Sequence, residues 1–149
     1  MKKMILLLLL LLLIPFAQGR AADVLLNLNR SGDLIIVSIV NSSRHDMTVS
    51  KVFTINPAFG LIKFYVNVNG RIHPAVGYPD EILPSVSDYT ILSPFDVVGR
   101  AFDISEIRRR YRTGKDCFDL HVEYHDAMAK KFGAYQGILE SNTIDVCEE

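Results

Sequence analysis

Residues 117–125, CFDLHVEYH, alternate between apolar and polar side chains. Because successive side chains of a β-strand point to opposite faces, this alternation predicts a strand with one face on a core and one face in water. The inward face of this strand is formed by Phe118, Leu120, Val122 and Tyr124. Residues 137–147, GILESNTIDVC, predict an antiparallel return strand in which Ile144 and Val146 point inward.

The only two cysteines of the chain lie at the outer ends of these two strands. If Cys117 lies opposite Cys147, then Phe118 faces Val146, and the other inward residues also share a side with their partners. Opposed Cβ atoms on neighbouring strands are ~4.5–5.5 Å apart, slightly beyond the ~3.5–4.5 Å of a disulfide, and local twist can close that gap. We therefore expect a Cys117–Cys147 disulfide, with two free thiols as the alternative.

The rest of the chain after residue 23 is typical of short strands joined by turns. Residues 34–40, LIIVSIV, are apolar on both faces and predict a central buried strand. Further strands are predicted at residues 24–29, 48–55, 62–68, 71–73, 89–92 and 97–104. Such a series of short strands with almost no helix predicts an all-β antiparallel sandwich or barrel.

One helix is predicted, at residues 105–112 (SEIRRRYR), with Ser105 capping its start. Its arginines near the C-terminal end suit the helix dipole. The arginine cluster is Arg108, Arg109, Arg110 and Arg112. We interpret this cluster as a solvated surface turn, and an anion or partner site is the alternative.

Residues 1–19 have the three parts of a signal peptide. Lys2 and Lys3 precede an unbroken apolar run at residues 5–14, and Ala17 and Gly19 supply the small residues before a cleavage site. Cleavage after residue 21 is the close alternative. The apolar run is shorter than the ~20 residues of a membrane span, so we expect no stable membrane insertion after cleavage. Export to the periplasm or the extracellular space would also permit the disulfide.

The charge of the chain is small. Its formal net charge is −1, and removal of the two lysines of the signal peptide makes it more negative. This gives no electrostatic basis for binding nucleic acid or an anionic membrane surface. Residues 20–149 are expected to form a single domain.

The order of the motifs resembles the immunoglobulin-like domain that precedes the catalytic part of deuterolysin-type (aspzincin) zinc metallopeptidases. That domain also occurs in stand-alone secreted bacterial proteins. The similarity covers residues 34–146 and rests on Asn41 at the end of a strand, the Asn69–Gly70 turn, ILSPF and AFDI at residues 91–95 and 101–104, and residues 137–143. Phe95 stands where the pattern has glycine, and the cysteine pair lies outside the pattern. The resemblance implies an immunoglobulin-like antiparallel β-sandwich of about seven to nine strands.

The resemblance does not imply catalysis. The peptidase part follows this module in those enzymes, whereas this chain ends at residue 149 and contains no His-Glu-x-x-His. We therefore expect a protein that is not an enzyme and needs no cofactor. His121, Glu123 and His125 share one strand face in ~6.6 Å steps and could hold Zn²⁺ if their side chains converged. An exposed polar face is the simpler interpretation.

Two segments are candidates for binding a partner. Residues 126–136, DAMAKKFGAYQ, connect the two strands of the predicted hairpin, and their candidate contacts are Lys130, Lys131, Phe132 and Tyr135. Phe132 or Tyr135 could equally fold back onto the core. Residues 56–60, NPAFG, are similar to a loop of chagasin-type cysteine-protease inhibitors.

The sequence thus predicts an exported non-catalytic β-sandwich module that binds a protein or a component of the cell envelope. A secreted protease inhibitor that acts through loops at one end of the sandwich is the alternative function. The expected partner is an unknown protein or a protease.

Overall fold

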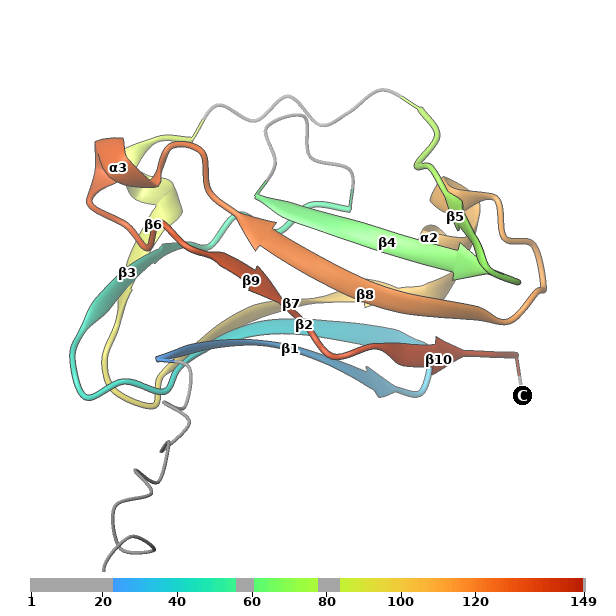
Figure 1. Cartoon of the computed structure of the whole chain (residues 1–149), viewed down its shortest axis with the longest axis horizontal. Helices are drawn as coiled ribbons and strands as arrows, with labels where there is room; N and C mark the ends of the chain where they lie inside the picture. Colours follow the sequence, from blue (N-terminus) through green and yellow to red (C-terminus); the bar gives the residue numbers. More distant parts are fainter. Residues whose placement is uncertain (1–22, 56–60, 78–83, 149) are drawn as a thin grey trace, which may run out of the picture.

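Alternating apolar residues form antiparallel sheets that pack face to face in the computed structural model of the chain (Figure 1). The structure describes residues 23–55, 61–77 and 84–148. Its strands are β1 (Val24–Ser31), β2 (Leu34–Asn41), β3 (Met47–Ser50), β4 (Ile62–Val68), β5 (Arg71–His73), β6 (Tyr89–Leu92), β7 (Val97–Asp103), β8 (Phe118–His125), β9 (Ile138–Glu140) and β10 (Ile144–Val146). The helical segments are the 3₁₀ turn η1 (Val86–Asp88), α2 (Ile104–Tyr111) and α3 (Ala129–Phe132).

The strand order confirms the immunoglobulin-like sandwich. One sheet has the order β1-β2-β7, and the facing sheet has the order β10-β8-β4-β5, with β9 also paired to β8. β3 and β6 form a separate antiparallel pair. In the chain, β3 directly follows β2, and β6 directly precedes β7. The described part contains ten strands, one more than the expected maximum, because the predicted return strand is divided into β9 and β10.

β8 is the central strand of its sheet, and its inward face is buried as predicted. Phe118, Leu120, Val122 and Tyr124 are each at most 2% exposed. They pack against the buried residues of the opposite sheet, Leu28, Ile35, Val37 and Ile39. The edge-to-face contact between Phe64 of β4 and Phe102 of β7, with ring centroids 5.1 Å apart, links the two sheets on the other side of the core.

The predicted register holds for β10 and fails for β9. Val146 lies opposite Phe118 as expected, whereas Leu139 of β9 lies opposite Tyr124, one residue out of step with β10. The expected continuous return strand is therefore interrupted after β9. A backbone that leaves a ladder needs other hydrogen-bond partners, and Ser141 supplies one because its Oγ accepts from the Val122 N–H at 2.9 Å.

Asn142, in the same interruption, ties the return strand to the other sheet. Its Oδ1 accepts from the backbone N–H of Leu28 at 2.9 Å, and its Nδ2 donates to the Leu28 carbonyl at 2.8 Å. The side-chain amide thus acts on the outer edge of β1 as a peptide group of a neighbouring strand would. Farther along the same edge, the Arg30 guanidinium donates to the Cys147 carbonyl at 3.1 Å.

Asn41 satisfies the backbone at the break between β2 and β3. Although fully buried, its side chain donates to the carbonyls of His45 and Leu92 and accepts from the N–H and hydroxyl of Ser43. All of its amide hydrogens and its oxygen therefore have partners, which explains how an asparagine can occupy the core at this point.

The predicted helix is confirmed as α2, but its cap differs from the prediction. Asp103, not Ser105, is the N-cap residue, and its carboxylate accepts from the Ser105 N–H at 2.7 Å. The helix buries Ile107 and Tyr111 against the core. Among the helices that the structure describes, none is long and apolar enough to cross a membrane.

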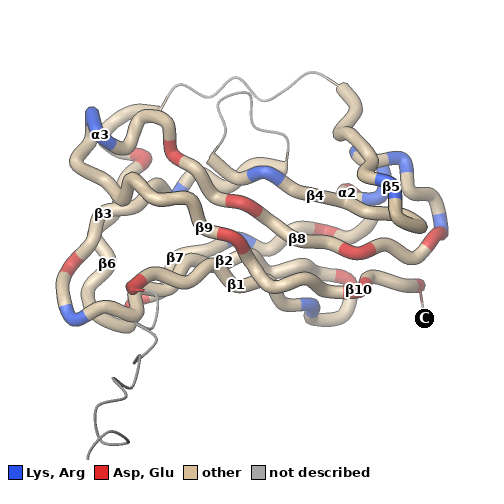
Figure 2. The backbone as a smooth tube through the Cα atoms, viewed as in Figure 1, with Lys and Arg blue, Asp and Glu red and all other residues tan. Residues whose placement is uncertain are grey.

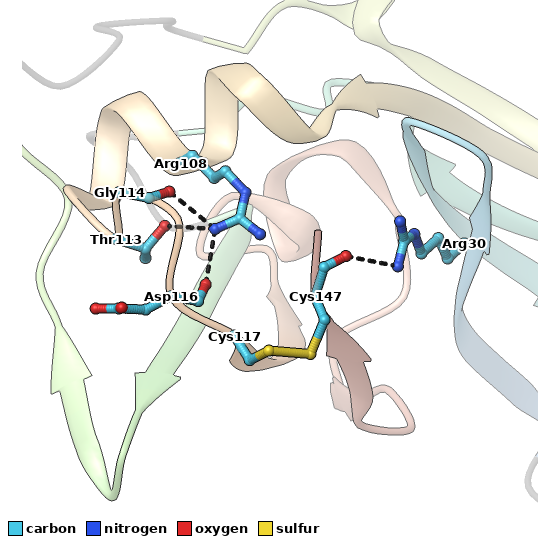
Figure 3. The surroundings of a disulfide bond; sticks show 7 residues. All are labelled: Arg30, Arg108, Thr113, Gly114, Asp116, Cys117 and Cys147. Atoms are coloured by element: carbon cyan, nitrogen blue, oxygen red, sulfur yellow. Dashed lines mark hydrogen bonds between the residues drawn. A yellow bond between two sulfur atoms is a disulfide. The ribbon is translucent and has the colours of Figure 1, made fainter. Parts of the chain in front are cut away.

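The Cys117–Cys147 disulfide is present, as predicted (Figure 3). The Arg108 guanidinium holds the turn before Cys117 by donating to the carbonyls of Gly114 and Asp116, and it lies over the Phe118 ring at 5.1 Å. Arg108 is therefore a structural residue and not part of a solvated cluster. By contrast, Arg109 makes only an exposed contact with Glu106 at 3.9 Å.

Removal of the disulfide is expected to destabilise the protein. The bond joins residues 30 apart in sequence, so the Cys117→Ser/Cys147→Ser variant should lose about 3–4 kcal/mol of unfolding free energy through the freedom gained by the unfolded chain. Urea unfolding of parent and variant measures the difference. Equal unfolding midpoints would show that the bond contributes nothing.

Asn142→Ala should also destabilise the protein, because it leaves the N–H and carbonyl of Leu28 without their partners. We expect a loss of about 1–3 kcal/mol in the same unfolding experiment. Asn29→Ala is the matched control, because Asn29 is an exposed asparagine of the same strand β1. A loss of equal size in both variants would contradict a bridging role for Asn142.

Candidate binding groove

The segment between β8 and β9 is a docked turn and not a free loop. Its short helix α3 ends at Phe132 and is capped by Gly133, which has a φ of 64°. The Tyr135 N–H then donates to the Thr48 carbonyl of β3 at 2.9 Å. Ala129 and Ala134 are buried. These contacts fix α3 beside β3 and β6, at the end of the sandwich opposite β5 (Figure 1).

A stacked aromatic pair joins α3 to β6. The rings of Phe132 and Tyr89 have centroids 4.5 Å apart and are inclined by 29°. Beside this pair lies an open groove of about 420 Å³. It is lined by Thr48, Val86, Tyr89, Thr90, Ile91, Lys131 and Phe132.

The groove combines apolar surface with positive charge. Val86 is 78% exposed and Ile91 is 64% exposed, so two large apolar side chains are grouped at this surface. Lys130 and Lys131 stand exposed on α3, where Figure 2 shows basic residues at the tip of the molecule. The Lys131 Nζ lies 5.1 Å from the centre of the Phe132 ring. Such a surface can bind an apolar side chain that is flanked by a carboxylate.

Two polar groups, the Asp126 carboxylate and the Tyr89 hydroxyl, are buried as neighbours beside the aromatic stack. Asp126 is 5% exposed, and its Oδ1 accepts from the Met128 N–H at 2.8 Å. Its Oδ2 and the Tyr89 hydroxyl are buried without a hydrogen bond of good geometry. Burial, followed by the neighbouring Asp126 carboxylate, raises the pKa of Tyr89.

Tyr124 anchors the strand that forms the wall of the groove. Its hydroxyl lies within the core and accepts from the Ser50 N–H at 3.3 Å. The next residue, Lys51, donates its N–H to the Asp88 carbonyl at 2.8 Å and so connects β3 to η1. Burial raises the pKa of Tyr124 to about 12.

The predicted partner-binding residues divide into two groups. Lys131 and Phe132 line the groove, and Lys130 stands beside them on α3. Tyr135 is half-buried and packs against the core, so it is placed away from this groove. Sequence reasoning missed Val86, Tyr89 and Ile91, although the outward position of the apolar Ile91 between Thr90 and Leu92 was a readable signal.

The structure does not bring His121, Glu123 and His125 together as metal ligands. The His121 ring stacks on Tyr65 of β4, with centroids 4.5 Å apart and an interplanar angle of 1°. The Tyr65 hydroxyl donates to Glu123 Oε2 at 3.2 Å, and His125 is exposed. Within residues 23–55, 61–77 and 84–148, no three His, Cys, Asp or Glu side chains are placed to hold a metal ion.

Residues 56–60, the candidate inhibitor loop, lie outside the described residues. Comparison of the chain with models of known protein families and with curated proteins found no match in either set. The resemblance to the domain that precedes the deuterolysin-type catalytic part therefore stays a prediction.

Alkaline pH should destabilise this end of the molecule through Tyr124. A folded-state pKa of about 12 exceeds the ordinary tyrosine pKa of ~10, so the unfolded chain loses the phenolic proton first. The stabilisation is complete below pH ~10 and is lost as the pH rises toward ~12. Two pKa units correspond to a loss of about 3 kcal/mol of unfolding free energy. Melting temperatures measured across this range should fall less steeply for Tyr124→Phe than for the parent. Tyr65→Phe, which changes a half-buried phenol on the outer sheet face, is the control and should follow the parent.

Proposed function

We propose that this protein is an exported, non-catalytic β-sandwich module that binds a partner protein or a component of the cell envelope through the groove beside α3. The observation that carries the proposal is the exposure of Val86 and Ile91 next to the Tyr89–Phe132 stack. Large apolar side chains grouped around a concave surface are typical of interaction sites.

The groove is well suited to binding because its parts are fixed before a partner arrives. Phe132 is held by its stack with Tyr89, and the surrounding backbone is tied down by the Tyr135 and Lys51 hydrogen bonds. A rigid aromatic surface loses little conformational entropy when it is covered. The lysines at its rim favour a partner segment with an apolar anchor and a neighbouring acidic group.

Export is supported by two independent features. Residues 1–19 have the composition of a signal peptide, and the Cys117–Cys147 bond is of a kind that persists in oxidising compartments. Both features agree with a partner in the periplasm or outside the cell.

The test is capture of a partner from the native exported fraction with the purified protein, followed by identification and affinity measurement. The Ile91→Ser/Lys131→Ser variant should reduce the affinity for the identified partner at least tenfold, which is about 1.4 kcal/mol. Its matched control is Ile72→Ser/Lys115→Ser, which also removes one exposed apolar residue and one exposed lysine, but outside the groove.

The proposal fails if both variants bind as the parent does, or if the control loses as much affinity as the groove variant. Both variants should retain the parent melting temperature, since the replaced side chains are exposed. If the captured partner is a peptidase whose activity the protein blocks, the inhibitor alternative is favoured.

A further inference from the structure

The two edge strands of the β1-β2-β7 sheet, β1 and β7, differ in whether their outer backbone groups have hydrogen-bond partners. The outer edge of β1 is occupied, because Asn142 bonds both backbone groups of Leu28 and Arg30 bonds the Cys147 carbonyl. Along the part of the chain that the structure describes, β7 pairs with β2 alone. Within residues 23–55, 61–77 and 84–148, no strand pairs with the other side of β7, which we call its open edge.

The register identifies which backbone groups face this open edge. Two bonds at the ends of the β2–β7 ladder set its phase: the Ile104 N–H donates to the Asp33 carbonyl, and the Asn41 N–H donates to the Asp96 carbonyl. The residues of β2 that exchange hydrogen bonds with β7 are therefore the odd-numbered ones. Because such pairs alternate in an antiparallel ladder, Val98, Arg100 and Phe102 bond toward β2. The N–H and carbonyl groups of Val97, Gly99 and Ala101 point away from β2.

The ladder on the other side of β2 confirms this phase. There the Ser42 N–H donates to the Asp23 carbonyl, so even-numbered residues of β2 bond toward β1 and odd-numbered residues bond toward β7. The same alternation turns the backbone groups of Leu28 away from β2, where Asn142 is found to bond them.

The open edge carries neither of the two residue types that most often block strand pairing, lysine and proline. Such edges are usually protected by lysine, proline, a bulge or covering chain, and residues 97–103, VVGRAFD, contain no lysine or proline. Val97 is 59% exposed, and Gly99 and Ala101 are also exposed. The one cation of the strand, Arg100, is exposed, and its guanidinium donates to the Phe53 carbonyl at 2.8 Å and lies over the Phe102 ring.

We propose that β7 pairs with β7 of a second copy of this chain, antiparallel and centred on Gly99. In this register Gly99 faces Gly99 of the second copy, and Val97 faces its Ala101. Val97, Gly99 and Ala101, whose backbone groups point away from β2, thus lie opposite one another across the two copies. A two-fold axis through the Gly99 pair requires this arrangement. The result is a continuous six-stranded sheet across the dimer.

The charges and sizes of the side chains fit this register. Arg100 lies opposite Val98 of the second copy, so no cation opposes its own image at the axis. Glycine is required at the centre for another reason, because an added Cβ at position 99 would lie 2.3 Å from the Val37 carbonyl oxygen. The missing side chain also removes any obstacle at the point where the two copies meet.

Pairing would also extend an existing apolar surface. The outer face of the same sheet carries Leu25 and Leu34, each 41% exposed, and half-buried Ile36 and Val40. The paired edge itself is short, and it buries less than the ~800 Å² per partner of a standard interface. We therefore expect reversible dimers with a micromolar dissociation constant.

Sedimentation velocity of the purified exported protein, over a concentration series through the micromolar range, tests the proposal. The parent should shift from monomer to dimer with concentration. Ala101→Pro should stay monomeric, because proline removes an N–H that faces the edge and that β2 does not use. Ala101→Lys is a second disrupting variant, in case proline disturbs folding. Both variants should keep the parent circular dichroism spectrum.

Leu25→Lys is the matched control for the sheet face and should dimerise as the parent does. Hydrogen exchange gives a residue-level readout: the amides of Val97, Gly99 and Ala101 should become protected only at concentrations at which the dimer forms. A parent that stays monomeric throughout overturns the proposal. So does loss of dimers in Leu25→Lys with retention in Ala101→Pro, which would instead indicate face-to-face association.

Discussion

The burial of one complete face of β8 is the interaction on which the other elements depend. Its inward residues, from Phe118 to Tyr124, are almost without solvent exposure, while its backbone is paired with β4, β9 and β10. A slip of one residue would move Asp119 and His121 into the core, at a cost of several kcal/mol for each unpaired buried group. This constraint fixes the register that sets Cys117 opposite Cys147, and the disulfide then holds the end of the sheet.

Two asparagines let the strands leave this regular pattern without unsatisfied backbone groups. Asn41 closes the break after β2, and Asn142 closes the break between β9 and β10. A primary amide carries two donors and an acceptor, so it can replace a missing peptide group. The first break directs the chain into the β3–β6 pair that forms the groove wall. The second break blocks the edge of β1 and leaves β7 as the open edge of that sheet in the described residues.

The outer surfaces differ in how far their side chains satisfy one another. On the outer face of β8, His121, Tyr65 and Glu123 form a stack and a hydrogen bond among themselves. At the groove and along β7, by contrast, Ile91 and Val97 are exposed apolar side chains. The two proposed contacts use these two surfaces separately, so a dimer through β7 and a partner in the groove can be tested independently.

The sequence by itself determined the β8 strand, its inward face, the Phe118–Val146 register, the disulfide and the position of α2. These features follow from local alternation and from having only two cysteines, and local patterns are sufficient to specify them. Only the tertiary structure decided how the segment between β8 and β9, which carries α3, packs against the rest of the protein. Phe132 stacks on Tyr89, a residue 43 positions earlier in the chain, and the groove arises from that contact. Periodicity reports which face of a strand is apolar, but it carries no information about which distant segment covers that face. For the same reason the sequence could not separate the β1 edge, which Asn142 blocks, from the open edge of β7.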